Sequence, residues 1–313
     1  MSKRKKSRAE QDSAWKDVLD SYFKECMEFF YNDLCNMIDW SKGYESLDSE
    51  LQAITSEKIQ GKKFVDKLIK VKTKDNKVNI LFFHVEVQGR KEDGFQERLF
   101  HYYCRLYDKY KLPILTLAIL TDNDLSWRPS SYSFSLWGHN IINFNFFTQK
   151  LIDFKDKLHD LFFHKNPFGL VVACHLAGME TAGKLQSRVR LDKKYHLTKQ
   201  LYENGLTKDA IITFFKMIDW VLVLPSNLAL EFKDKIHKLE EARKVTYITS
   251  IQQIGREEGL QQGLQQGLQQ GLEKGRHEED LVIAKRMLAR GYDHKAIKDL
   301  TELSDQDLLK LED

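Results

Sequence analysis

The sequence has few cysteines and no long hydrophobic segment. Its four cysteines stand at positions 26, 35, 104 and 174 without C-x-x-C spacing, so neither a zinc site nor a disulfide framework is indicated. No apolar run approaches the roughly 18 residues of a membrane-spanning helix, and no signal-peptide pattern is visible. These absences predict a protein of the reducing cytoplasm that does not enter a membrane.

The length and charge of the chain predict one compact domain with an appendage. The chain has 313 residues, of which 42% are hydrophobic and 30% charged. Residues 256–313 hold 13 Asp and Glu against 9 Lys and Arg, a balance of −4, so the net charge of +3 leaves +7 for residues 1–255. Five positive charges lie in the first eight residues. They predict a basic, disordered arm over residues 1–12, which either contacts phosphates or simply aids solubility.

Two apolar segments joined by a polar turn predict a β-hairpin across residues 61–89. Asp66 lies in the first segment and Glu86 near the end of the second, where an ionised carboxylate is costly unless it is paired or bound to metal. A three-residue turn places Asp66 directly opposite Glu86, whereas a two-residue turn sends the two acids to opposite faces. The first register predicts a site for a hard divalent ion, above all Mg²⁺. The alternative is a pair of solvent-facing acids neutralised by neighbouring lysines.

A wider pattern surrounds these acids. Asp66 is followed by Glu86-Val87-Gln88 and by Phe95-Gln96-Glu97-Arg98, which opens an aromatic helix. L-D-S-E-L-Q at residues 47–52, S-W-R-P at residues 126–129 and a glycine-periodic tail accompany them. In this order the motifs resemble the recombination-promoting nuclease family (Rpn, the YhgA-like transposases) of the PD-(D/E)XK nuclease superfamily. The resemblance implies an α/β fold with a restriction-endonuclease-like mixed sheet flanked by helices and a helical C-terminal tail.

The resemblance also implies a role for each polar residue. Asp66 and Glu86 would bind the metal, and Glu50 from the preceding helix would be a third acidic ligand. Gln88 stands where the superfamily usually has lysine, so it could orient a water or a phosphate oxygen but carries no positive charge. Either a cation from elsewhere compensates or catalysis is weak. Arg98 would hold a substrate phosphate, although an arginine on a solvated helix face needs no such role.

The other elements follow from periodicity. Apolar spacing predicts helices over residues 17–38, 47–57 and 95–110, and a buried strand over residues 112–120. Alternating residues on either side of Gly138-His139 predict a second hairpin that extends the sheet. These elements predict a nuclease-like domain over residues 13–250. Its core covers about residues 45–150, and a mostly helical part at residues 150–250 completes it.

The tail has an unusual repeat. In residues 251–276 glycine recurs every four positions beside leucine and glutamine. Because each interior glycine costs a helix about 1 kcal/mol relative to alanine, the segment predicts either a helix that self-associates along its glycine ridge or a flexible linker. A homo-oligomer through this repeat is expected. Residues 277–313 predict a small helix-turn-helix-like module, whose acidic charge favours dimerisation or partner docking over base reading.

These patterns together predict a bacterial, metal-dependent DNA endonuclease linked to recombination or mobile elements. It would hydrolyse phosphodiester bonds with Mg²⁺ or another divalent cation, and its partner would be DNA. Two alternatives remain open. One is a catalytically inactive nuclease-fold protein that acts in DNA binding or assembly, and the other is a transposase.

Overall fold

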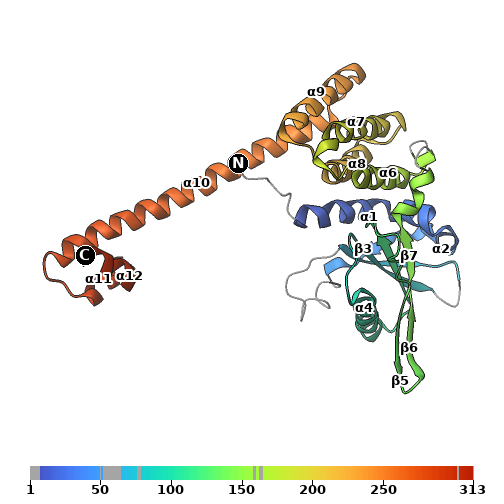
Figure 1. The fold of residues 1–313 in the computed structure, drawn as a ribbon, viewed down its shortest axis with the longest axis horizontal. Coiled ribbons are helices and arrows are strands. Elements are labelled where there is room, and N and C mark those ends of the chain that lie inside the picture. Colours follow the sequence, from blue (N-terminus) through green and yellow to red (C-terminus); the bar gives the residue numbers. More distant parts are fainter. Residues whose placement is uncertain are drawn as a thin grey trace. The chain divides into compact units, whose positions relative to one another are not determined.

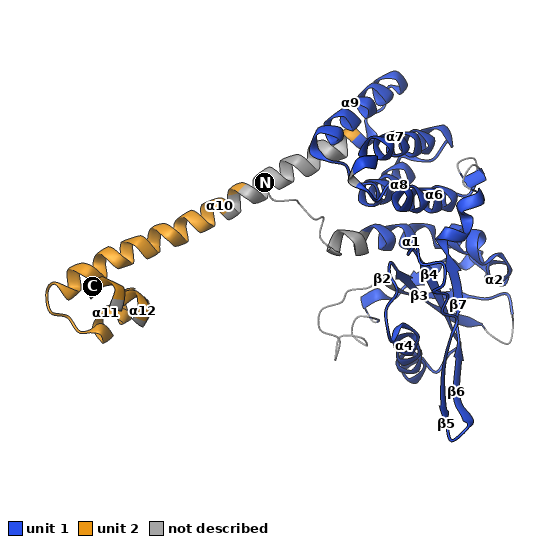
Figure 2. Ribbon diagram, in the orientation of Figure 1, with its two compact units in different colours: residues 1–248 blue, residues 249–313 orange. Residues whose placement is uncertain are grey.

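The computed structural model describes residues 8–49, 51, 65–75, 79–157, 160–161, 165–301 and 303–312. The chain forms two compact units, residues 1–248 and 249–313, which Figure 2 colours separately. Of the described helices, none combines the length and the apolar character needed to cross a membrane.

The first unit is built on a mixed five-stranded sheet in the order β1-β2-β3-β4-β7 (Figure 1). β2 (Val65–Lys72) pairs antiparallel with both β1 (Tyr44–Ser46) and β3 (Ile80–Gln88). β4 (Ile114–Leu120) is parallel to β3, and β7 (Phe147–Lys150) is parallel to β4. The strands β3, β4 and β7 therefore end at one edge of the sheet, called the carboxyl edge below.

Helices cover both faces of this sheet, so β3 is buried along most of its length. On one face α1 (Arg8–Phe30) packs its Phe23 against Phe83 of β3, with ring centroids 5.6 Å apart. On the other face lies α4 (Phe95–Tyr110). The remaining helices are α2 (Asn32–Asn36), α6 (Phe168–Glu180), α7 (Ser187–Glu203), α8 (Lys208–Val221), α9 (Ser226–Arg243) and the 3-10 helices Trp40–Lys42, Leu151–Lys157 and Lys184–Gln186. The fold is α/β, a mixed sheet flanked by helices, which is compatible with a nuclease-like fold.

The hairpin formed by β2 and β3 has the register expected for a three-residue turn. Its backbone pairs include Val65 with Val87 and Asp66 with Glu86. Residues 76–78, which contain most of the turn, lie outside the described part of the chain. The expectation that residue 66 lies opposite Glu86 is therefore confirmed at the level of the backbone.

The predicted helices agree with the structure in different degrees. α4 has the expected bounds, and its buried residues recur at helical spacing: Phe95, Leu99, Tyr102 and Leu106. The helix expected at residues 17–38 begins earlier, at Arg8, and is followed by the separate α2. Residues 8–12, assigned above to the basic arm, are thus helical, in keeping with the high helix propensity of Ala9, Glu10 and Gln11. Of the helix expected at residues 47–57, residues 48, 49 and 51 are helical and the rest is outside the described residues.

The prediction that the second hairpin extends the main sheet was wrong. β5 (Ser131–Leu136) and β6 (His139–Asn145) form a two-stranded sheet of their own, and β7 is the strand that extends the main sheet. The hairpin packs an aromatic side chain, Tyr132, on Phe100 of α4, with ring centroids 5.2 Å apart. This contact buries one face of the hairpin on the helix, which an edge position in the main sheet would not do.

The second unit consists of α10 (Tyr247–Leu288), α11 (His294–Thr301) and α12 (Asp305–Glu312), the first of which begins in the other unit. The glycine repeat lies within α10, so the backbone there is helical. A small apolar cluster joins the three helices: Ala284, Ile297, Leu303 and Leu308. The turn after α10 uses Gly291 with a φ of 83°, which suits glycine. Self-association through the repeat stays a prediction.

Burial of His175 makes stability depend on pH. This side chain of α6 lies between Trp15 and Trp220, with ring centroids 5.4 and 5.8 Å away, and burial lowers its pKa from 6.5 to about 4. In the unfolded chain this histidine binds a proton below about pH 6.5, whereas in the folded chain it stays neutral down to about pH 4. The free energy of unfolding therefore falls as the pH falls through this window.

We expect His175→Phe to remove that dependence. Between pH 7 and pH 4 the free energy of unfolding of the wild type should fall by up to about 3 kcal/mol more than that of the variant. Urea unfolding followed by tryptophan fluorescence at several pH values measures this difference. Parallel losses in the two proteins would show that His175 is not buried in its neutral form.

Candidate functional site

Glu86 is a fully buried carboxylate near the carboxyl edge. It lies in β3 between residue 66 of β2 and Ala118 of β4, both at register positions directly opposite. Side chains alternate along a strand, so Glu86 shares the face covered by α4 with His84 and Gln88. A buried carboxylate is tolerated only where charge or hydrogen bonds compensate it. The compensating group comes from α4.

Arg98 of α4 supplies this charge. Its Nη2 lies 2.8 Å from Glu86 Oε1, its Nη1 lies 3.0 Å from Glu92 Oε2, and its side chain is 10% exposed. The guanidinium also lies over the ring of Phe95, 5.3 Å from the centroid. α4 begins directly after Gly94, whose φ of 78° lets the chain turn sharply into the helix. Arg98 is then one turn inside the helix, level with the end of β3.

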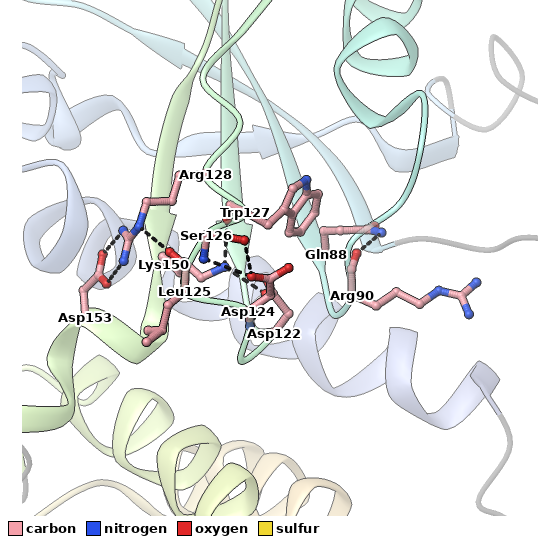
Figure 3. A network of polar contacts seen from close by, with 10 residues as sticks. All are labelled: Gln88, Arg90, Asp122, Asp124, Leu125, Ser126, Trp127, Arg128, Lys150 and Asp153. Carbon is pink, nitrogen blue, oxygen red and sulfur yellow. Dashed lines mark hydrogen bonds and ion pairs between the residues drawn. The ribbon is translucent and has the colours of Figure 1, made fainter.

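Gln88 links the same groups through its amide. Its Nε2 donates to Glu92 Oε2 at 3.1 Å and to the carbonyl of Arg90 at 2.9 Å, and its Oε1 accepts from Arg98 Nη2 at 3.4 Å. Figure 3 shows this amide turned toward the Arg90 carbonyl. Contacts link the four side chains of Glu86, Gln88, Glu92 and Arg98, which are called the edge network below. Arg98 therefore brings a positive charge to the place where Gln88 lacks one.

A second polar set holds the loop between β4 and β5 at the same edge. Lys150, at the end of β7, is buried and binds Asp122 Oδ1 at 2.8 Å and the carbonyl of Trp127 at 2.9 Å (Figure 3). The indole of Trp127 packs edge-on against Phe95, with centroids 5.4 Å apart. Since Phe95 also lies under the Arg98 guanidinium, this loop supports the helix that carries Arg98.

The S-W-R-P motif of residues 126–129 belongs to this loop. Asp124 Oδ1 accepts from the backbone N–H of Ser126 at 2.9 Å and from its hydroxyl at 2.6 Å. Arg128 forms two hydrogen bonds with Asp153, at 2.7 and 2.5 Å, and these hydrogen bonds lower the pKa of the Asp153 carboxyl. The motif therefore has a structural role here, which is to fix the loop to the first turn after β7.

A buried lysine anchors the L-D-S-E segment. The fully buried Nζ of Lys67 lies 2.5 Å from Asp48 Oδ2 and 3.0 Å from Ser46 Oγ, and it also contacts Asp20 of α1. Lys67 pairs with Val85 in the hairpin, so it points to the face opposite Glu86. Asp48 thus ties the start of this segment to β2, one residue from Asp66.

The structure brings together three of the five residues predicted for the site: Glu86, Gln88 and Arg98. Asp66 lies opposite Glu86 in the backbone register, while Glu50 and the side chain of Asp66 lie outside the described structure. Within the part that is described, no three His, Cys, Asp or Glu side chains gather as a metal site. Glu92 was missed, because nothing in the sequence shows that the link between β3 and α4 folds back onto the edge.

The residues at this edge fit a hard cation. Glu86 and Glu92 bring two carboxylates against one guanidinium, and carboxylate oxygens are the ligands that Mg²⁺ prefers. Arg98 contacts Oε1 of the Glu86 carboxylate. Residue 66 lies directly opposite Glu86 in the backbone register.

Comparison with known proteins adds an independent observation. Residues 277–313 match the family model described as the Rpn/YhgA-like nuclease family, C-terminal HTH domain. This match supports membership of the Rpn/YhgA-like nuclease family. No curated protein and no solved structure matches the chain. The Rpn match covers only the C-terminal part of the second unit, from the end of α10 onward, whereas the edge network lies in the first unit.

The edge network predicts a large cost for losing Arg98. In Arg98→Met the buried Glu86 and the partly buried Glu92 lose their contact with this cation, so the free energy of unfolding should fall by about 3 kcal/mol, and Glu86→Gln in the same chain should recover part of it. Arg188→Met is the matched control, because it breaks the exposed ion pair with Glu231, which contributes little to stability in water. Urea unfolding of the wild type and of the three variants measures their free energies of unfolding. Equal losses in the two arginine variants would contradict the burial of the edge network.

Proposed function

We propose that this protein is a metal-dependent DNA endonuclease whose active site lies at the carboxyl edge, around Glu86. The observation that carries the proposal is a buried carboxylate, in register with a second acid on the neighbouring strand, held by an arginine from the following helix. The Rpn nuclease match supports the same reaction class.

The proposed roles follow from position and chemistry. Asp66 and Glu86 would hold Mg²⁺ or another divalent cation, with Glu50 as a third ligand. When bound, such an ion lowers the pKa of a water and stabilises negative charge on a phosphate. Gln88 would orient the attacking water through its amide, which can both donate and accept.

Arg98 would act in two ways. Its contact with Glu86 Oε1 fixes the orientation of that carboxylate. A guanidinium has five N–H donors, so it can hold Glu86 and still contact a phosphate oxygen of the substrate. This role replaces the positive charge of the lysine that the superfamily usually has at the position of Gln88.

The helix-turn-helix match supports DNA as the partner, but the charge of that unit limits its part in binding. Residues 256–313 carry a net charge of −4, the excess of 13 acidic over 9 basic residues. Duplex affinity depends mainly on neutralising phosphates, so we propose that the basic first unit supplies most of it. An inactive DNA-binding or assembly protein is the second candidate, since Gln88 replaces the usual lysine. A strand-transferring transposase is a third, and it would leave joined products.

Cleavage of supercoiled plasmid tests the proposal. We expect nicking with Mg²⁺ or Mn²⁺ and none with EDTA, and we expect Asp66→Asn and Glu86→Gln each to lower the rate by at least about a hundredfold. Arg188→Met is the matched control, because Arg188 of α7 pairs with Glu231 of α9, away from the carboxyl edge, and should keep the wild-type rate.

The other outcomes separate the candidates. Nicking that survives both acid substitutions would place the chemistry elsewhere or in a contaminant. Plasmid that is bound but never cut, with binding lost in Arg98→Ala, would favour the inactive DNA-binding protein. Joined products rather than nicks would favour a transposase.

A further inference from the structure

The β5–β6 hairpin has an apolar face that α4 covers only at its base. Tyr132 pairs with Phe144 in the register, and Phe100 of α4 stacks on Tyr132. Further along the hairpin, Phe134 pairs with Ile142, and Phe134 is largely exposed. Figure 1 shows the hairpin extending past α4. The apolar face therefore continues beyond the helix that buries its first part.

The far end of the hairpin exposes four large apolar side chains, called the outer patch below. Their exposed fractions are 44% for Phe134, 43% for Leu136, 90% for Trp137 and 58% for Ile141. At the base of the hairpin the apolar surface continues into a groove of about 280 Å³, lined among others by Phe100, Ile142 and Phe147. Large exposed apolar side chains gathered at one end of a hairpin indicate an interaction site.

Trp137 stands at a position that disfavours it. Leu136 pairs with His139, so the turn has two residues, Trp137 and Gly138, with φ of 50° and 81°. Positive φ at both residues defines a type I′ turn, which prefers Asn-Gly, and the left-handed conformation is unfavourable for a residue with a large side chain. A strained residue that is also almost fully exposed points to a contact outside the folded monomer.

The charge of this surface excludes some partners and fits others. No Asp, Glu, Lys or Arg occurs between Arg128 and Lys150, although 30% of the whole chain is charged. DNA affinity depends mainly on lysines and arginines that neutralise phosphates. The hairpin offers none of these side chains to a duplex. In a two-fold interface each patch meets its own copy, so a charge close to the axis would face the same charge of the second copy. A charge-free patch satisfies that condition.

The backbone of the hairpin fits the same partner. Within the described structure β5 and β6 pair only with each other, and an isolated two-stranded ribbon is marginally stable. Each strand has an outer edge whose backbone groups are open to pairing. Antiparallel pairing of one such edge with the same edge of a second copy obeys two-fold symmetry and joins the two ribbons into one sheet.

We propose that the outer patch is a homodimer interface, on which a second copy of this chain packs hairpin against hairpin. This interface is separate from the glycine repeat of α10, and it does not depend on the proposed nuclease activity. In this arrangement the far end of the hairpin contacts the second copy.

Sedimentation velocity of the full chain tests this interface. The variant Trp137→Asn/Phe134→Thr removes two apolar contacts but keeps an Asn-Gly turn and a β-branched strand residue, so the hairpin should still form. From about 1 to 100 µM the wild type should dimerise, and the variant should have a dissociation constant raised at least about tenfold. Leu230→Gln is the matched control, because Leu230 is 67% exposed on α9, outside the hairpin. It should dimerise as the wild type does.

Photo-cross-linking identifies the contact directly. A benzoylphenylalanine at position 141, in a mixture of ¹⁴N- and ¹⁵N-labelled chains, should give mixed-isotope cross-links between two peptides of residues 131–147. Three results would overturn the proposal: a wild type that stays monomeric throughout, a hairpin variant that dimerises normally, or mixed-isotope cross-links that join the hairpin to another segment, such as the glycine repeat. Weaker DNA binding by the hairpin variant with unchanged dimerisation would assign the patch to DNA instead.

Discussion

The contact between Arg98 and Glu86 is the interaction on which the arrangement of the carboxyl edge depends. A carboxylate in the middle of a two-sided sheet is costly to bury without compensation, and Arg98 of α4 supplies a cation to Glu86. This contact constrains the rotation of α4 about its own axis. The apolar side chains of α4 must pack on the sheet while Arg98 still reaches the end of β3. It also sets the short link before α4, where Gly94 makes the turn.

The same principle recurs on either side of β3. Lys67 in β2 and Lys150 in β7 are buried, and each is paired with a carboxylate from outside its own strand, Asp48 and Asp122 respectively. Because strand side chains alternate, a slip of one residue would turn each charge to the wrong face and away from its partner. The buried pairs therefore select the register of the sheet and fix the loops that carry the partners. We infer that they contribute more to the specificity of the fold than to its stability.

The central hairpin and α4 were predictable from the sequence because local patterns determine them. The period of two along β2 and β3 and the possible turn lengths left two registers, and the resemblance to the nuclease family favoured the one observed. The partners of Arg98 were not predictable, since they depend on how the link after Gln88 folds back to place Glu92. The second hairpin was assigned to the wrong sheet for a similar reason: alternation identifies a strand, but only the packing of Tyr132 on α4 decides where it lies.

The glycine repeat of α10 has a geometry of its own. An α-helix has 3.6 residues per turn, so positions four apart advance by about 40° beyond a full turn at each step. The ridge of glycines and the row beside it, in which Leu264, Leu268 and Leu272 are exposed, therefore wind around the helix in the right-handed sense. A straight partner could not follow such a ridge, because a hydrophobic period longer than 3.6 requires a right-handed supercoil. Self-association along this helix would thus have the opposite hand to an ordinary heptad coiled coil, which makes it geometrically distinct from the flat, two-fold pairing that the hairpin allows.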